Sequence, residues 1–116
     1  MTMAGEFRGL DEVELLEFFG VEPVARAVED GYWCYEISDK RGVMLRFSFN
    51  LYERSVQTAL SLGGSPVATV SHEGVDRMAV REGKLRCEFS TKGEKTALTV
   101  ETGGSLSVTW SSLRTE

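Results

Sequence analysis

The sequence predicts an α+β protein that is mainly β, with one N-terminal helix packed on an antiparallel, twisted meander or a partly closed barrel of about 7–8 strands. Two observations carry this prediction. Apolar and polar residues alternate in a series of short runs between residues 32 and 111, which is the pattern of half-buried strands. Clusters of turn-forming residues separate these runs, for example at 39–42, 63–66 and 103–104. Sequential strands usually pair with their neighbours, so a meander is the simplest arrangement.

The run at 43–51 is the centre of the predicted sheet. Leu45, Phe47 and Phe49 share one parity, whereas Arg46 and Ser48 fall on the other. Side chains alternate between the faces of a strand, so this strand has one dry face and one wetter face. Residues 52–54 are few enough to join it to the next run, 56–62, as an antiparallel hairpin. Further strands are predicted at 32–37, 67–71, 75–81, 85–89, 96–100 and 106–111.

Residues 10–20 have the spacing and the end signals of a helix. Asp11 is a favourable N-cap, and Glu14 three residues later completes a capping box. Gly20 suits the C-terminal end. The predicted buried stripe consists of Val13, Leu16 and Phe19, with Leu15 at its side. The segment 21–31 reads equally well as another helical turn or as an extended arm.

The totals indicate one domain. A chain of 116 residues can bury its own core, and we expect a frayed leader at 1–9 and a single globular domain at 10–116. There is no apolar run of the ~20 residues that span a membrane, and the N-terminus lacks the pattern of a secretory signal. We therefore expect a cytoplasmic protein with no membrane partner.

Motifs for catalysis and cofactor binding are missing from the sequence. Cys34 and Cys87 have no metal-binding spacing and are predicted to be structural thiols, although a disulfide between them is not excluded by sequence. The single histidine, His72, is predicted to lie in a turn. Phosphate-binding loops and nucleophile elbows do not occur. The expectation is a protein that is not an enzyme and that holds no metal or cofactor.

The charge of the chain is unevenly distributed. The net charge is −5, and residues 1–39 contain ten acidic and two basic residues. This balance argues against nucleic acid as a partner. It fits a surface that meets a basic protein, although a solvated helix face explains it too. Exposed tyrosine and tryptophan are common interface anchors, so the candidate partner-binding set is Asp11, Glu12, Glu14, Glu17, Glu22, Glu29, Asp30, Tyr32, Trp33 and Tyr52.

Three segments carry a resemblance to a known family. They are Glu-Phe-Phe-Gly-Val-Glu-Pro at 17–23, Leu-Arg-Phe-Ser-Phe-Asn at 45–50 and Ser-Val-Gln-Thr-Ala-Leu at 55–60. Together they resemble small bacterial immunity proteins found beside polymorphic or contact-dependent toxins, over roughly residues 10–90. The resemblance implies a non-enzymatic protein that binds and neutralises a cognate toxin domain. It assigns no contact residues.

Two other functions remain open at the level of sequence. A closed meander can carry one small apolar ligand. Its interior would be lined by Phe47, Phe49, Leu60, Phe89, Val108 and Trp110. An unpaired edge strand would instead favour a homo-oligomer such as a homodimer.

Overall fold

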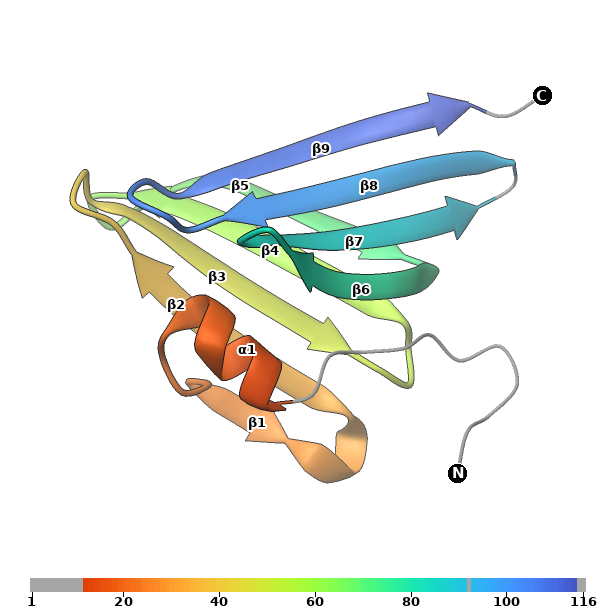
Figure 1. Ribbon diagram of the computed structural model, residues 1–116, viewed down its shortest axis with the longest axis horizontal. Helices are drawn as coiled ribbons and strands as arrows, with labels where there is room; N and C mark the ends of the chain where they lie inside the picture. The colour runs from red at the N-terminus through yellow and green to blue at the C-terminus, as the bar shows by residue number, and fades with distance from the viewer. Residues whose placement is uncertain (1–11, 92, 115–116) are drawn as a thin grey trace.

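A computed structural model of the chain describes residues 12–91 and 93–114 (Figure 1). The predicted leader and the predicted N-cap Asp11 lie outside the described residues. The described chain begins with the helix α1 (Glu12–Phe19). It continues with β1 (Ala25–Ala27), the 3-10 turn η1 (Val28–Asp30), β2 (Tyr32–Ser38), β3 (Val43–Asn50), β4 (Ser55–Leu62), β5 (Ser65–Glu73), β6 (Val75–Arg81), β7 (Lys84–Thr91), β8 (Glu94–Glu101) and β9 (Ser107–Arg114).

The strands form two antiparallel sheets. The first has the order β1-β2-β3-β4-β5 and the second the order β6-β7-β8-β9, so every strand pairs with a neighbour in sequence. The prediction of a mainly β meander with one N-terminal helix is confirmed. The meander is divided in two, however, and over residues 12–91 and 93–114 the sheets do not join into a closed barrel. The strand β1 was not among the predicted strands. It lies in the segment 21–31, which the sequence left open, and it pairs with β2.

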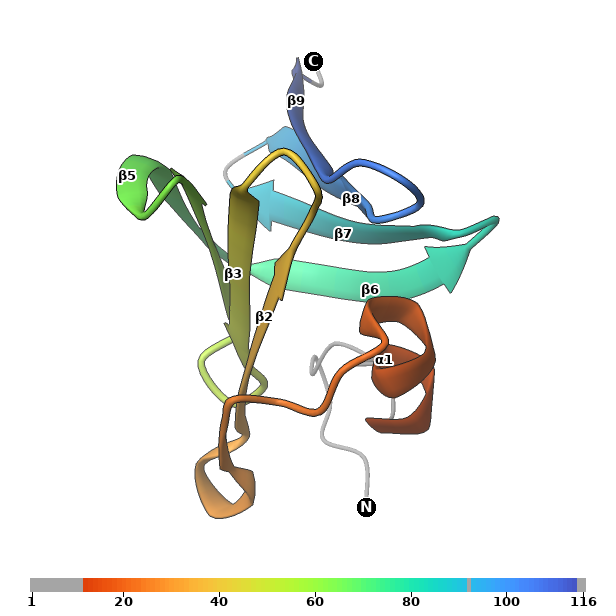
Figure 2. The same cartoon turned by 90° about the vertical axis from the view of Figure 1, so that its left-hand side faces the viewer.

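The chain leaves the first sheet at Gly74, which adopts a left-handed backbone conformation with φ 78°. Such a conformation favours glycine because it has no Cβ. The amide of Val75 then donates to the carbonyl of Arg54 instead of continuing the ladder of β5. Figure 2 shows the result, with β6, β7 and β8 crossing β2 and β3 rather than running alongside them.

The core lies between the two sheets. Leu45, Phe47 and Phe49 of β3 point inward, as the alternation predicted, and meet Leu85 and Leu98 from the second sheet in one packed cluster. The outward-facing Arg46 is exposed, whereas Ser48 is buried on the outer face. A cluster of this kind supplies most of the favourable free energy of folding.

The helix α1 packs with a different stripe from the predicted one. Leu15 and Phe19 are buried, whereas Val13 is 63% exposed and Leu16 is 40% exposed. The ring of Phe19 stacks on Tyr35 with a centroid distance of 4.8 Å. A helix of two turns touches the core through one narrow row, and residues four apart lie above one another on that row. The prediction that Val13 and Leu16 face the core was therefore wrong.

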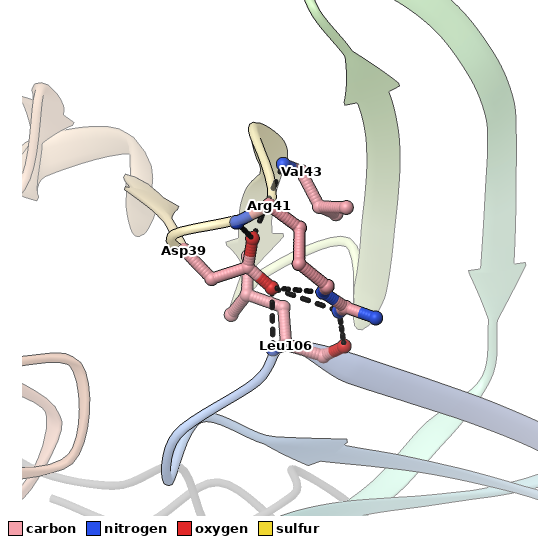
Figure 3. A network of polar contacts seen from close by, with 4 residues as sticks. All are labelled: Asp39, Arg41, Val43 and Leu106. Atoms are coloured by element: carbon pink, nitrogen blue, oxygen red, sulfur yellow. Dashed lines mark hydrogen bonds and ion pairs between the residues drawn. The ribbon is translucent and has the colours of Figure 1, made fainter.

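Two polar clusters connect the sheets. At one end, the Arg54 guanidinium donates to the carbonyl of Val75 (3.0 Å) and to Asp76 (2.9 Å). At the other end, the Asp39 carboxylate accepts bonds from the amide of Leu106 (3.0 Å) and from the Arg41 side chain (2.9 Å) (Figure 3). Arg41 also donates to the Leu106 carbonyl at 2.8 Å. These bonds hold the β2–β3 turn against the start of β9, and the accepted hydrogen bonds keep the pKa of Asp39 well below its usual value.

Candidate protein-binding surface

The helix α1 presents its acidic side chains to solvent. Glu12, Glu14 and Glu17 are exposed because Leu15 and Phe19 occupy the side of the helix that faces the core. Glu14 and Glu17 border a surface hollow of about 370 Å³ that also includes Gly83 in the β6–β7 turn. The sequence prediction placed these carboxylates off the buried stripe, and this placement is confirmed.

Glu12 is the member of the predicted set with the most complete set of local contacts. Its carboxylate accepts hydrogen bonds from the indole of Trp33 (2.6 Å) and from Arg26 (2.8 Å). Both bonds lower the pKa of Glu12, and the bond from Trp33 has the larger effect. Trp33 is half-buried and stacks on Phe49, with ring centroids 5.6 Å apart. Glu12 and Trp33 therefore connect α1 to β1 and β2, and much of the charge of Glu12 is balanced by Arg26.

A second group of predicted residues meets at the turn before β2. Glu29 and Asp30 are exposed in η1. Gly31, which follows them, lies directly against the ring of Tyr52 and bonds through its carbonyl to the amide of Leu51 at 2.9 Å. Tyr52 itself is 62% exposed. The structure thus brings an exposed aromatic side chain beside two exposed carboxylates.

Tyr32 does not belong to this group. Its strand neighbour Trp33 faces the inside of the sandwich, so Tyr32 faces the outer side of the first sheet, where it is half-buried near Cys34 and Ser48. Burial raises the pKa of its hydroxyl. Glu22 is exposed and lines a small hollow with Glu12 and Leu16.

Exposed apolar side chains accompany the acidic ones, and the sequence prediction missed them. Most of the large apolar side chains that are exposed in the described residues lie between 13 and 28 or at Tyr52. Here the term acidic face means the exposed residues Glu12, Val13, Glu14, Leu16, Glu17, Glu22, Val24, Val28, Glu29, Asp30 and Tyr52. Exposed apolar side chains among charged ones are typical of protein-binding surfaces. The available sequence signal was the surplus of apolar residues on a helix too short to bury them all.

The reactive side chains of the described chain have packing roles. Both cysteines are free and buried; Cys87 lies in the core, where burial raises its pKa well above the usual range, and the Arg46 guanidinium donates to the Cys34 sulfur at 3.2 Å. His72 lies in β5, not in a turn as predicted, and stacks on Phe89 at 4.5 Å. Among the described residues, no cluster of histidine, cysteine and acidic side chains is arranged to hold a metal ion.

The residues suggested as the lining of a ligand cavity pack instead against one another. Phe47, Phe49 and Phe89 are buried in the core cluster, and Leu60, Val108 and Trp110 pack against it. Within the described part of the chain, α1 is too short to cross a bilayer, and no other helix is long and apolar enough to do so.

Comparison with known proteins gives a single kind of likeness. No protein-family model matches the sequence, and the search of curated proteins gave no match. The fold is similar to a chain of the contact-dependent growth inhibition toxin–immunity protein complex from Klebsiella pneumoniae 342, with a TM-score of 0.85 and 25% sequence identity. The likeness covers 96% of this chain and all of that chain. The resemblance seen in three short sequence segments is thereby confirmed over the whole fold.

Proposed function

We propose that this chain is a non-enzymatic immunity protein that acts in the cytoplasm, where it binds a cognate toxin domain and neutralises it. The observation that carries the proposal is the whole-chain likeness to a chain of a contact-dependent growth inhibition toxin–immunity protein complex. Such a likeness includes both sheets and the helix, so it is more than a shared sheet motif.

The exposed surface is of the kind expected for the inhibitor, rather than the toxin, in such a pair. The acidic face combines carboxylates with exposed valine, leucine and tyrosine side chains. His72 and Cys87, the groups best suited to proton transfer or nucleophilic attack, are used in packing. A protein that works by occupying a partner needs surface complementarity rather than an assembled reaction centre.

The acidic face gives the proposal a physical mechanism. A toxin domain that attacks nucleic acid has a basic cleft for phosphates. Carboxylates at Glu14 and Glu17 attract such a cleft from a distance and select the orientation of encounter. The apolar residues Val13 and Leu16 then exclude water from the contact and slow dissociation.

Growth of bacteria tests the proposal directly. The toxin domain proposed as its partner is expressed alone, with this chain, and with the chain carrying Glu14→Lys and Glu17→Lys. We expect arrest with the toxin alone and normal growth when this chain is present or expressed by itself. Arrest by this chain on its own would place it on the toxin's side, and failure to protect would refute the immunity role.

Association kinetics test the placement of the interface. The double reversal Glu14→Lys/Glu17→Lys is expected to lower the association rate constant roughly tenfold in about 0.02 M salt, with a smaller effect in about 0.5 M salt. Glu73→Lys is the control, because Glu73 is an exposed carboxylate in β5, at the opposite edge of the first sheet from β1. An unchanged rate constant at low salt would exclude the acidic face, even if the chain still protects cells.

A further inference from the structure

The outer face of the second sheet is basic although the chain as a whole is acidic. Met78, Val80, Leu85 and Cys87 point into the core or pack against it, so the alternate residues of β6 and β7 point outward. These outward residues are Arg77, Ala79, Arg81, Lys84, Arg86 and Glu88, and all but Ala79 and Glu88 are exposed cations. The acidic face and this face therefore carry opposite charge.

These residues surround a hollow of about 360 Å³, here called the basic hollow. Its lining consists of Arg77, Ala79, Arg81, Lys84, Arg86, Glu88 and Thr99. Ala79 lies opposite Arg86 in the ladder, and Thr99 lies opposite Arg86 on the other side. Two small side chains thus flank Arg86 along a row across the sheet. The longer side chains of Arg77, Arg81 and Lys84 line the hollow around this row.

The charges around the basic hollow are not balanced within the described chain. Arg86 forms an ion pair with Glu88 at 3.0 Å. Arg77, Arg81 and Lys84 have no carboxylate within ion-pair distance among the described residues. Arg81 and Lys84 are moreover direct partners in the antiparallel register. Like charges that face each other across a ladder destabilise a sheet, and a bound anion would offset that cost.

We propose that the basic hollow binds carboxylate groups of an acidic segment of a protein partner. Guanidinium groups are planar and pair with carboxylates through two parallel hydrogen bonds, which suits the arginines around the hollow. Recognition of single-stranded nucleic acid on a sheet uses exposed aromatic side chains. The outward positions of β6, β7 and β8, and those of β9 as far as Ser111, carry alanine, serine, threonine and charged residues instead. The inference does not depend on the immunity role, because that role was assigned to the acidic face, whereas the basic hollow consists of other residues and has the opposite charge.

The acidic face and the basic hollow meet at the same turn. Arg81 and Lys84 flank the β6–β7 turn, and Gly83 of that turn lines the hollow bordered by Glu14 and Glu17. One partner with a basic and an acidic patch side by side could therefore cover both. Such two-signed complementarity restricts the choice of partner more than one patch does.

The test uses the full-length chain and a fluorescently labelled peptide of ten glutamates at low salt. We expect binding that weakens with salt, and a loss of affinity of about tenfold in Arg81→Glu. This variant replaces a like-charged cross-strand pair with an attractive one, so its thermal stability should not fall. Lys40→Glu is the control, because it changes the net charge equally at an exposed lysine in the β2–β3 turn and should bind the peptide within about twofold of wild type.

Several results would overturn the proposal. The proposal would be refuted if the chain failed to bind the peptide at low salt, or if Arg81→Glu and Lys40→Glu lost affinity equally. Tighter binding of a ten-nucleotide RNA than of the peptide would assign the hollow to nucleic acid. Concentration-dependent dimerisation that Arg81→Glu abolishes would assign it to a second copy of this chain. Toxin binding is measured separately, so failure of the immunity role leaves this test intact.

Discussion

A pair of adjacent leucines in α1 offers a direct test of how the helix is attached. Leu15 and Leu16 are the same residue type in the same helix, but Leu15 is 1% exposed and Leu16 is 40% exposed. Replacement of either by alanine changes intrinsic helix propensity by the same small amount. The difference between the two variants therefore reports burial alone.

The expected magnitude follows from that burial. Leu15→Ala removes a buried side chain and leaves a cavity, which costs about 3 kcal/mol in the free energy of unfolding. Leu16→Ala should cost at most about 1 kcal/mol, because much of its side chain is already in water. Domains of this size have only about 5–15 kcal/mol in total, so Leu15→Ala should remain folded with a melting temperature lower by roughly 10–15 °C.

Thermal unfolding followed by circular dichroism measures both variants against wild type, and urea unfolding gives the free energies. Equal losses for the two variants, or a larger loss for Leu16→Ala, would refute the packing described for α1. The second result would restore the stripe of Val13, Leu16 and Phe19 that the sequence alone suggested.

Three further predictions concern polar groups. The pKa of Asp39 is lowered by its hydrogen bonds, so its carboxylate stabilises the fold above about pH 4 and this contribution is lost as the pH falls. Asp39→Asn should therefore melt below wild type at pH 6, with a gap that narrows in acid. Burial lowers the pKa of His72, so wild type should lose stability below about pH 6.5 relative to His72→Gln, as calorimetry at pH 7.5 and 5 would show. Trp33→Phe keeps the ring but removes the bond to Glu12, so the pKa of Glu12 should rise when titrated by NMR.

Each of these has a result that would contradict it. A gap that stays constant from pH 6 to pH 3 would remove Asp39 from the connection between the sheets. Parallel pH profiles for wild type and His72→Gln would mean that the imidazole is equally hydrated in the folded and unfolded chain. An unchanged titration of Glu12 in Trp33→Phe would leave Arg26 as the sole cause of its lowered pKa.

The strands could be predicted from the sequence because their signal is local. Alternation at 43–50 and turn residues at 52–54 are enough to define β3, β4 and the hairpin between them. The division into two sheets could not be predicted in this way. It depends on Gly74 and on a hydrogen bond between Val75 and Arg54, residues far apart in the sequence.

The candidate surfaces show the same limit. The acidity of residues 12–30 was visible as composition, and the structure displays it on α1 and η1. The exposure of Val13 and Leu16 could not be predicted, because helical spacing alone does not decide which of two overlapping stripes meets the core. The sequence prediction also missed the basic hollow, although Arg77 and Arg81 share one parity in β6 and Lys84 and Arg86 share one parity in β7. The net charge of −5 is a sum over the whole chain, so it does not reveal the local positive charge of these residues.

The most direct test of the central claim is to mix the purified chain with the toxin domain proposed as its partner and to measure both mass and toxin activity. The immunity role predicts a one-to-one complex in native mass spectrometry and complete inhibition at one equivalent. Separate masses for the two proteins, with full toxin activity at excess of this chain, would contradict it.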